Sequence, residues 1–153
     1  MRWKLAALLL SVPLACSPFG LWPRLMVEPP AGFAAMAEKG VYRAVSPEGL
    51  PYRVRTFENK PEKTLAFWSE TLKYHLQKEG YRLNGEGQSF LAGEAPGMAF
   101  EWLVAYGNET YLYLTAVIVT AGKIILAEAA GPYPLFIQYR QGLKNSLQSI
   151  RLR

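Results

Sequence analysis

The chain has 153 residues, half of them apolar and 13% aromatic, which is the composition of one globular domain and excludes an intrinsically disordered protein. Its net charge is +5, and without Arg2 and Lys4 of the leader-like N-terminus 15 basic and 12 acidic residues leave +3. This mild basic bias favours anionic headgroups over nucleic acid as a partner. A single cysteine excludes an intramolecular disulfide, and the lack of any Asp excludes mechanisms that require one.

The N-terminus is typical of a secretory leader. Two basic residues precede an apolar stretch from Leu5 to Leu14, which is shorter than the roughly 20 residues that span a bilayer. The segment 12–16, Val-Pro-Leu-Ala-Cys, resembles a bacterial lipobox. The resemblance implies that the Cys16 thiol is acylated, that residues 1–15 are removed as a signal peptide, and that the exported lipoprotein is anchored at the periplasmic or outer face of the envelope. A buried or incidental free cysteine is one alternative, and an uncleaved leader with a plain export role is the other.

The segment after the cysteine is interpreted as a tether. Residues 16–39 are assigned to the lipidated cysteine and a proline-rich tether, and residues 40–153 to a single folded domain. Prolines and glycines between residues 18 and 32 disfavour helices and strand ladders. Apolar residues such as Trp22 and Phe33 are unusual in a free linker. We therefore expect part of the tether to pack loosely on the domain, with contact to the lipid surface as the alternative.

The first elements of the domain are a hairpin and a helix. Two strands, 41–45 and 50–57, flank the turn Ser46-Pro47-Glu48-Gly49, whose proline and glycine positions suit a type I turn. Alternation places Arg53 and Arg55 on the face opposite to the apolar residues of the second strand. A helix over 60–79 follows, with an apolar stripe at helical spacing and a C-terminal glycine. The stripe consists of Leu65, Trp68, Leu72 and Leu76.

The second half of the domain predicts a run of long strands and a last helix. Strands are expected over 98–106, 111–120 and 123–129, with turns at Gly107-Asn108 and Ala121-Gly122. A helix is expected over 133–149, followed by a short strand. The sequence therefore predicts an α+β domain, with an antiparallel sheet built from an early hairpin and a three- to four-strand meander and packed with two main helices. The central strands are apolar on both faces, so both faces should be covered.

This order of elements resembles the PsbP-like and DcrB-like fold. The resemblance covers residues 41–152 and rests on the early hairpin turn and on the tail Ser146-Leu147-Gln148-Ser149-Ile150-Arg151-Leu152. It implies an exported bacterial lipoprotein or an accessory subunit of a membrane complex. No binding residue of the family transfers to this chain position by position, and the fold carries no shared catalytic motif.

Candidate binding residues are aromatic and basic side chains on the strands. Aromatic side chains on neighbouring strands form either core packing, which is the more frequent case, or an exposed platform for a ligand. The two arginines form either a solvated strand face or a contact to headgroups or an acidic partner. The candidates are Trp102, Tyr106, Tyr111, Tyr113, Arg53 and Arg55.

The residues with catalytic or metal-binding chemistry are sparse. His75 is the only histidine, and with Glu79 it forms an i, i+4 pair, whereas a stable metal site needs three or four ligands. The favoured interpretation is a half-buried helical histidine beside a glutamate. The glycine-rich segment 84–87 lacks the third glycine and the following helix of a phosphate-binding loop. We therefore expect no catalytic residue, no metal and no cofactor.

Two functions remain open at this level. The leading hypothesis is a non-catalytic, membrane-anchored binding or scaffolding module of the cell envelope, whose partners are membrane lipid, through the acylated Cys16, and an envelope protein. The alternative is a small-molecule or lipid carrier with a cavity between sheet and helix, lined by Trp102, Tyr113 and Trp68. An enzyme ranks third, because it would require His75, a glutamate and a metal in one cleft.

Overall fold

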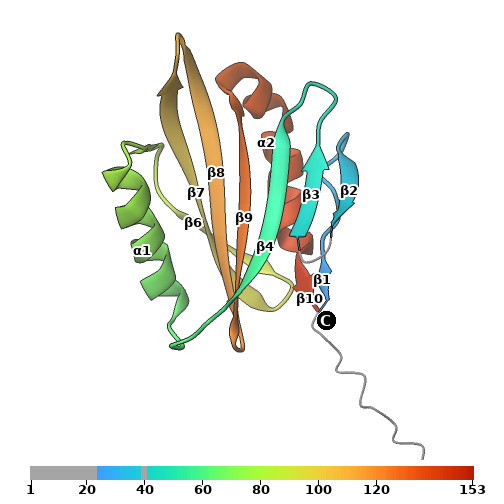
Figure 1. The fold of residues 1–153 in the computed structure, drawn as a ribbon, viewed down its shortest axis with the longest axis vertical. Helices are drawn as coiled ribbons and strands as arrows, with labels where there is room; N and C mark the ends of the chain where they lie inside the picture. The colour runs from blue at the N-terminus through green and yellow to red at the C-terminus, as the bar shows by residue number, and fades with distance from the viewer. Residues whose placement is uncertain (1–23, 39–40) are drawn as a thin grey trace, which may run out of the picture.

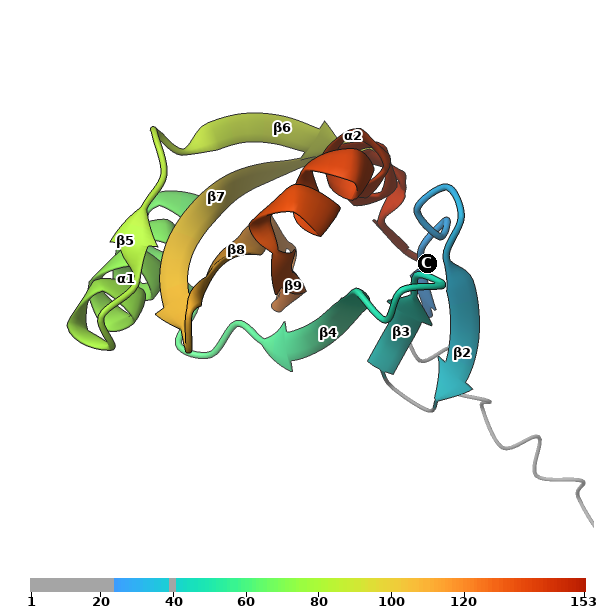
Figure 2. The same cartoon turned by 90° about the horizontal axis from the view of Figure 1, so that it is seen from above.

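The domain is an antiparallel sheet that curves around one helix and carries a second helix on its outer side (Figures 1 and 2). This computed structural model describes residues 24–38 and 41–153. Cys16 and the expected signal peptide lie outside the described residues. The helices are α1 (Leu65–Lys78) and α2 (Tyr133–Ser149). None of the helices among the described residues is long and apolar enough to cross a membrane.

The main sheet has eight strands in the order β2-β3-β4-β9-β8-β7-β5, with β6 paired to another part of β7. All pairs are antiparallel. A separate two-stranded sheet joins β1 (Leu25–Met26) to β10 (Arg151–Leu152). The strands of the main sheet are β2 (Ala34–Glu38), β3 (Val41–Val45), β4 (Pro51–Glu58), β5 (Arg82–Leu83), β6 (Gln88–Ala92), β7 (Ala95–Tyr106), β8 (Glu109–Thr120) and β9 (Lys123–Pro132).

The α+β class predicted from the sequence is confirmed, and so are the early hairpin and the bounds of α2. The meander has four strands, β6 to β9. The sequence of β6, Gln-Ser-Phe-Leu-Ala, predicts no strand by itself, because it does not alternate cleanly between polar and apolar side chains. The helix expected from residue 60 begins later, at Leu65, because the Thr64 hydroxyl caps it by accepting a hydrogen bond from the Phe67 amide at 3.2 Å.

The main core lies between the concave face of the sheet and α2. Phe136, Leu143 and Leu147 of α2 are almost fully buried against inward side chains of β4, β8 and β9. A smaller cluster on the outer face consists of Leu76 of α1 with Phe100 and Trp102 of β7. Both faces of β8 are therefore covered, by α2 on one side and α1 on the other, as its apolar sequence predicted, whereas the outer face of β9 carries the charged Glu128.

The N-terminal segment is part of the sheet structure. β1 and β2 lie within residues 16–39, which the sequence analysis assigned to the tether. Leu25 and Val27 pack against the core, and the Glu28 amide donates a hydrogen bond to the Ser149 hydroxyl at 2.9 Å. Residues 24–38 therefore belong to the folded domain. Their apolar side chains pack on the core, and β2 pairs with the edge of β3.

Neither helix covers the outer face of the sheet over β3 and β4. α1 packs on β5, β7 and β8, and α2 lies on the concave side (Figure 2). Arg43 of β3 is exposed, and Met36 of the neighbouring strand β2, which lies opposite it, is 48% exposed. This open half of the outer face is where polar residues of several strands meet.

Candidate functional site

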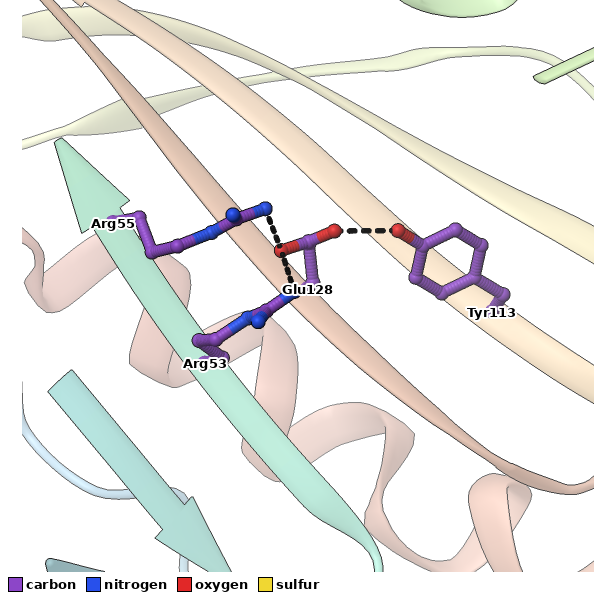
Figure 3. Close-up of polar contacts among 4 residues, drawn as sticks. All are labelled: Arg53, Arg55, Tyr113 and Glu128. Carbon is purple, nitrogen blue, oxygen red and sulfur yellow. Dashed lines mark hydrogen bonds and ion pairs between the residues drawn. The ribbon is translucent and has the colours of Figure 1, made fainter. Parts of the chain in front are cut away.

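Glu128 of β9 forms the centre of a polar network on the outer face (Figure 3). Its Oε2 accepts hydrogen bonds from Arg53 Nη2 at 3.0 Å and from Arg55 Nη2 at 2.7 Å, both of which are also ion pairs. Its Oε1 accepts a hydrogen bond from the Tyr113 hydroxyl at 2.6 Å. Only 13% of the Glu128 side chain is exposed. The hydrogen bonds of its carboxylate therefore come mainly from these protein partners, which lie on both neighbouring strands.

Strand register explains why these residues meet. Arg53 of β4 lies directly opposite Glu128, so their side chains point to the same face. Arg55 and Tyr113 each lie one diagonal step away, because their direct partners in β9 are Leu126 and Ala130. A diagonal pair is within reach of a long side chain. The alternation of β4, β8 and β9 is therefore sufficient to build the network.

The network fixes the protonation state of its members. Partial burial disfavours the charged carboxylate, but the Tyr113 hydrogen bond and the nearby Arg55 and Arg53 guanidinium groups outweigh it and lower the pKa of Glu128. Burial, together with the hydrogen bond to the Glu128 carboxylate, raises the pKa of Tyr113. At neutral pH the carboxylate is ionised and the phenol keeps its proton. Neither group is poised to exchange a proton with a substrate, which favours recognition over acid–base chemistry.

A groove of about 420 Å³ runs beside this network. We call it the arginine groove; side chains of five strands line it, among them Met36, Arg43, Val45, Arg53, Tyr113 and Glu128. Arg43 lies directly opposite Arg53 across the β3–β4 pair. The groove therefore brings Arg43 and Arg53 to one face of the sheet, beside Glu128.

The predicted binding residues divide into three groups. Arg53, Arg55 and Tyr113 come together around Glu128. Trp102 is completely buried, and its Nε1 donates a hydrogen bond to the Thr115 hydroxyl at 2.9 Å, so it belongs to the core.

Tyr106 and Tyr111 form the third group. They lie at the far end of the β7–β8 hairpin, where their rings contact edge to face with centroids 5.6 Å apart. The Tyr106 side chain is largely exposed, with 74% of the residue accessible. The single platform considered in the sequence analysis is therefore three separate features: the Glu128 network, a core tryptophan and an exposed tyrosine pair at a hairpin tip.

Glu128 was missed by the sequence analysis. Its signal is an acidic residue in the middle of the strand Lys-Ile-Ile-Leu-Ala-Glu-Ala-Ala-Gly-Pro, on the face that alternates with buried Ala127 and Ala129. A charged residue in such a position is rarely left without a partner. Two arginines on the same face of another strand are the matching signal, but only the β4–β9 pairing connects them.

The structure shows no assembled metal site in the part of the chain that it describes. Within residues 24–38 and 41–153, no group of three or more ligating His, Cys or Glu side chains is close enough to hold a metal ion. His75 is exposed on α1, whereas the sequence analysis expected it to be half-buried.

Comparisons with known proteins bear on the fold. No family model matches the sequence, and a search of curated proteins finds no match. Among solved structures, cyanobacterial PsbP (CyanoP) from Synechocystis aligns with a TM-score of 0.61 and 16% identity, over 93% of this chain and all of that chain. The chain has the PsbP-like fold.

Two further structures share this architecture. LpqN, described as involved in cell envelope biogenesis of Mycobacterium tuberculosis, aligns with a TM-score of 0.62 and 8% identity, over 85% of this chain and 83% of its own. A protein of unknown function from Pseudomonas aeruginosa aligns with a TM-score of 0.60 and 6% identity, over 79% of this chain and 97% of its own. At these identities the PsbP-like fold is shared, while functional residues are not transferred.

Proposed function

We propose that the chain is an exported, lipid-anchored protein of the cell envelope whose PsbP-like domain is a non-catalytic binding module. The module recognises an acidic surface of a partner protein through the arginine groove. The anchor rests on the lipobox-like segment that ends at Cys16. The envelope location is also supported by the similarity of the fold to LpqN, which is described as an envelope protein.

The observation that carries the binding role is the uncovered half of the outer face, which is rich in arginine. Three arginines, Arg43, Arg53 and Arg55, lie on this face with Glu128 as the acidic residue of the network. Exposed apolar side chains flank them, with Met36 48% and Phe57 44% accessible. Exposed apolar side chains beside arginines, a residue type enriched at protein interfaces, favour a protein interface over an enclosed ligand cavity.

The carrier alternative has weaker support. It called for a cavity lined by Trp102, Tyr113 and Trp68. The pocket found between α1 and the sheet has a volume of about 450 Å³ and is lined by other residues, among them Leu65, Met98 and Phe100. Glu70, Lys73 and Glu86 also line it, and three charged side chains make a poor receptor for an apolar cargo.

Site-directed photocrosslinking in membranes tests the binding role. A photoreactive amino acid replaces Val45, which lines the groove and lies outside the Glu128 network. We expect a discrete adduct whose yield falls several-fold at high salt and in the Arg43→Glu variant, because both weaken attraction to an acidic surface. The matched control is Arg82→Glu, which reverses an exposed charge on β5 at the other end of the sheet. Equal yields from Arg43→Glu and wild type would contradict the proposal.

A further inference from the structure

The start of α1, the β6–β7 and β8–β9 turns and the β1–β10 pair meet at one end of the domain, which we call the basal end (Figure 1). The main-chain N–H of Asn59, just before α1, donates a hydrogen bond to the Gly122 carbonyl in the β8–β9 turn. A pocket of about 340 Å³ connects this turn to the β6–β7 turn and to β10, because Ala121, Glu94 and Leu152 all line it. The basal end is therefore one continuous surface.

The basal end carries more basic than acidic side chains. Five exposed basic residues lie there, and within the part of the chain that the structure describes none of them forms an ion pair. The exposed acidic residues beside them are Glu28, Glu62 and Glu94. Glu58 and Lys123 pair with each other, so their charges cancel. The five basic residues are Arg24, Lys60, Lys63, Arg151 and Arg153.

The opposite end of the domain has a different charge. Its connections are residues 46–50 between β3 and β4, residues 79–81 after α1, and residues 107–108 between β7 and β8. They contain Glu48 and Glu79 and no basic residue. An anionic surface is therefore attracted to the basal end and not to the opposite end.

Exposed apolar side chains lie near the basic residues of the basal end. Met26 of β1 is 43% exposed, Phe67 in the first turn of α1 is 46% exposed, and Leu91 near the end of β6 is 60% exposed. The Lys63 ammonium lies over the Phe67 ring, 5.6 Å from its centroid. Basic and apolar side chains together suit the surface of a bilayer, where the charges contact headgroups and the apolar groups reach the boundary of the acyl chains.

The chain leads toward Cys16 from this same end. Arg24, the first described residue, and Arg153 exchange main-chain hydrogen bonds at the basal end. The eight residue steps between Arg24 and Cys16 span at most about 30 Å. β8, which joins the two ends of the domain, has 12 residues and is therefore roughly 40 Å long. An anchor at Cys16 would thus bring the basal end closest to the bilayer.

We propose that the basal end lies on the anionic surface of the bilayer that holds the Cys16 anchor. This inference rests on the proposed function, because it requires the anchor, but it does not involve the arginine groove. The basic side chains attract anionic headgroups, and the exposed apolar side chains enter the headgroup region. The contact fixes the orientation of the domain, so that the β7–β8 hairpin tip points away from the bilayer (Figure 1).

Fluorescence of the anchored protein tests the proposal. The full chain is purified from bacterial membranes in detergent and reconstituted into vesicles of equal parts phosphatidylcholine and phosphatidylglycerol. An environment-sensitive dye is attached to a cysteine that replaces exposed Ala121 in the β8–β9 turn. The matched control carries the dye in place of exposed Asn108, in the turn at the other end of β8. We expect nitroxide on the lipid headgroups to quench the dye at residue 121 and not the dye at residue 108.

The same labels report the role of charge. Quenching at residue 121 should fall several-fold in vesicles of phosphatidylcholine alone, at high salt and in the double variant Lys60→Glu/Lys63→Glu, because each change weakens attraction to anionic headgroups. The matched control is Lys78→Glu/Arg82→Glu, which reverses two exposed charges away from the basal end and should leave the quenching unchanged.

The possible outcomes separate this inference from the proposed function. Equal quenching at residues 121 and 108, or no quenching at either, would overturn the basal end as the surface that contacts lipid. Quenching at residue 121 that is the same without phosphatidylglycerol would overturn its preference for anionic lipid. Reaction of the dye with the wild-type chain would reveal a free Cys16 thiol; the anchor would then be wrong, and this inference with it. The crosslinking experiment judges the arginine groove in every case.

Discussion

A single carboxylate connects three strands of this domain. Glu128 accepts hydrogen bonds from Arg53 and Arg55 on one side and from Tyr113 on the other. Its removal should cost more stability than removal of one partner of an exposed ion pair, because buried partners would lose their acceptor. The same carboxylate holds the two arginines against the sheet, so it also shapes the charge that the arginine groove presents.

We expect Glu128→Gln to lower the free energy of unfolding by about 1–3 kcal/mol at neutral pH, because two guanidinium groups lose their charged acceptor. Urea denaturation measures the change. Glu70→Gln is the control: Glu70 pairs with Lys73 on the surface of α1, and 71% of its side chain is exposed, so little change is expected. Equal effects of the two substitutions would show that the network does not stabilise the fold.

The pH dependence of stability follows from the lowered pKa of Glu128. A carboxyl whose pKa is lower in the folded state contributes stability that is fully present above the unfolded-state pKa, which is about 4.3 for glutamate. That contribution is lost as the pH falls through the lower pKa of the folded state. Urea denaturation between pH 7 and pH 3 should therefore show a smaller loss of stability for Glu128→Gln than for wild type. Parallel pH profiles would contradict this expectation.

At the scale of elements, α1 is attached to the sheet through a buried asparagine. The Asn59 side chain accepts hydrogen bonds from the Lys63 amide at 3.0 Å and from Trp68 Nε1 at 2.8 Å, and it donates one to the Lys63 carbonyl at 3.0 Å. The main-chain N–H of Asn59 donates a hydrogen bond to the Gly122 carbonyl in the β8–β9 turn. Asn59 therefore fixes where the chain leaves β4 and how α1 approaches the outer face.

Replacing Asn59 with Ala should cost about 2–3 kcal/mol of stability, because it leaves buried donors and an acceptor without partners. Thermal or urea unfolding measures the loss, and hydrogen exchange should rise first in α1. Asn145→Ala provides the comparison: Asn145 is exposed on α2, and its side chain accepts a hydrogen bond from Gln141. A cost below about 1 kcal/mol for Asn59→Ala would mean that α1 is held mainly by its apolar contacts.

Elements with a strong local pattern could be predicted from the sequence. The hairpin turn at Ser46–Gly49, the long strands of the meander and the apolar stripe of α2 gave the class and most of the architecture. The predicted start of α1 is too early. The side-chain hydrogen bonds of Asn59 and the Thr64 cap set where the helix begins, and the spacing of apolar residues does not show such bonds. The short strands β1 and β5 were not assigned, because two residues carry no period.

The candidate site was predictable in part. Alternation placed Arg53 and Arg55 on one face, and the aromatic pattern singled out Tyr113, which joins them in the network. Their common partner Glu128 depends on the pairing of β4 with β9, which joins segments about 70 residues apart. The register between two strands so far apart in the sequence is determined by how the whole sheet assembles, so a local sequence pattern cannot predict it.

At the scale of the whole molecule, a lipid on Cys16 would limit how far the domain can lie from a membrane. Eight residue steps separate Cys16 from Arg24, the first described residue. A fully extended chain of this length spans at most about 30 Å. With a lipid on Cys16, the end of the domain that carries β1 and β10 would face the membrane, and the β7–β8 hairpin tip with Tyr106 would point away from it (Figure 1).

Replacing Cys16 with Ser should release the protein from the membrane fraction, because the acyl chains would have no attachment point. Sedimentation of washed membranes followed by detection of the protein measures the effect. The variant should keep the stability of the domain, since residue 16 lies outside the described fold. Unchanged association with washed membranes would contradict lipidation at Cys16.

The pairing of β1 with β10 brings the start of the described chain next to its end, where Arg24 and Arg153 exchange main-chain hydrogen bonds. This contact has a mechanical consequence. If the chain is anchored through Cys16, a pull on the anchor would load the β1–β10 pair from the Arg24 end, and its hydrogen bonds would be expected to break one after another. Peeling the chain back as far as buried Phe33 would lengthen the tether by about 30 Å while the eight-stranded sheet stays folded. The segment that carries β1 would then act as an extensible linker between the membrane and the domain.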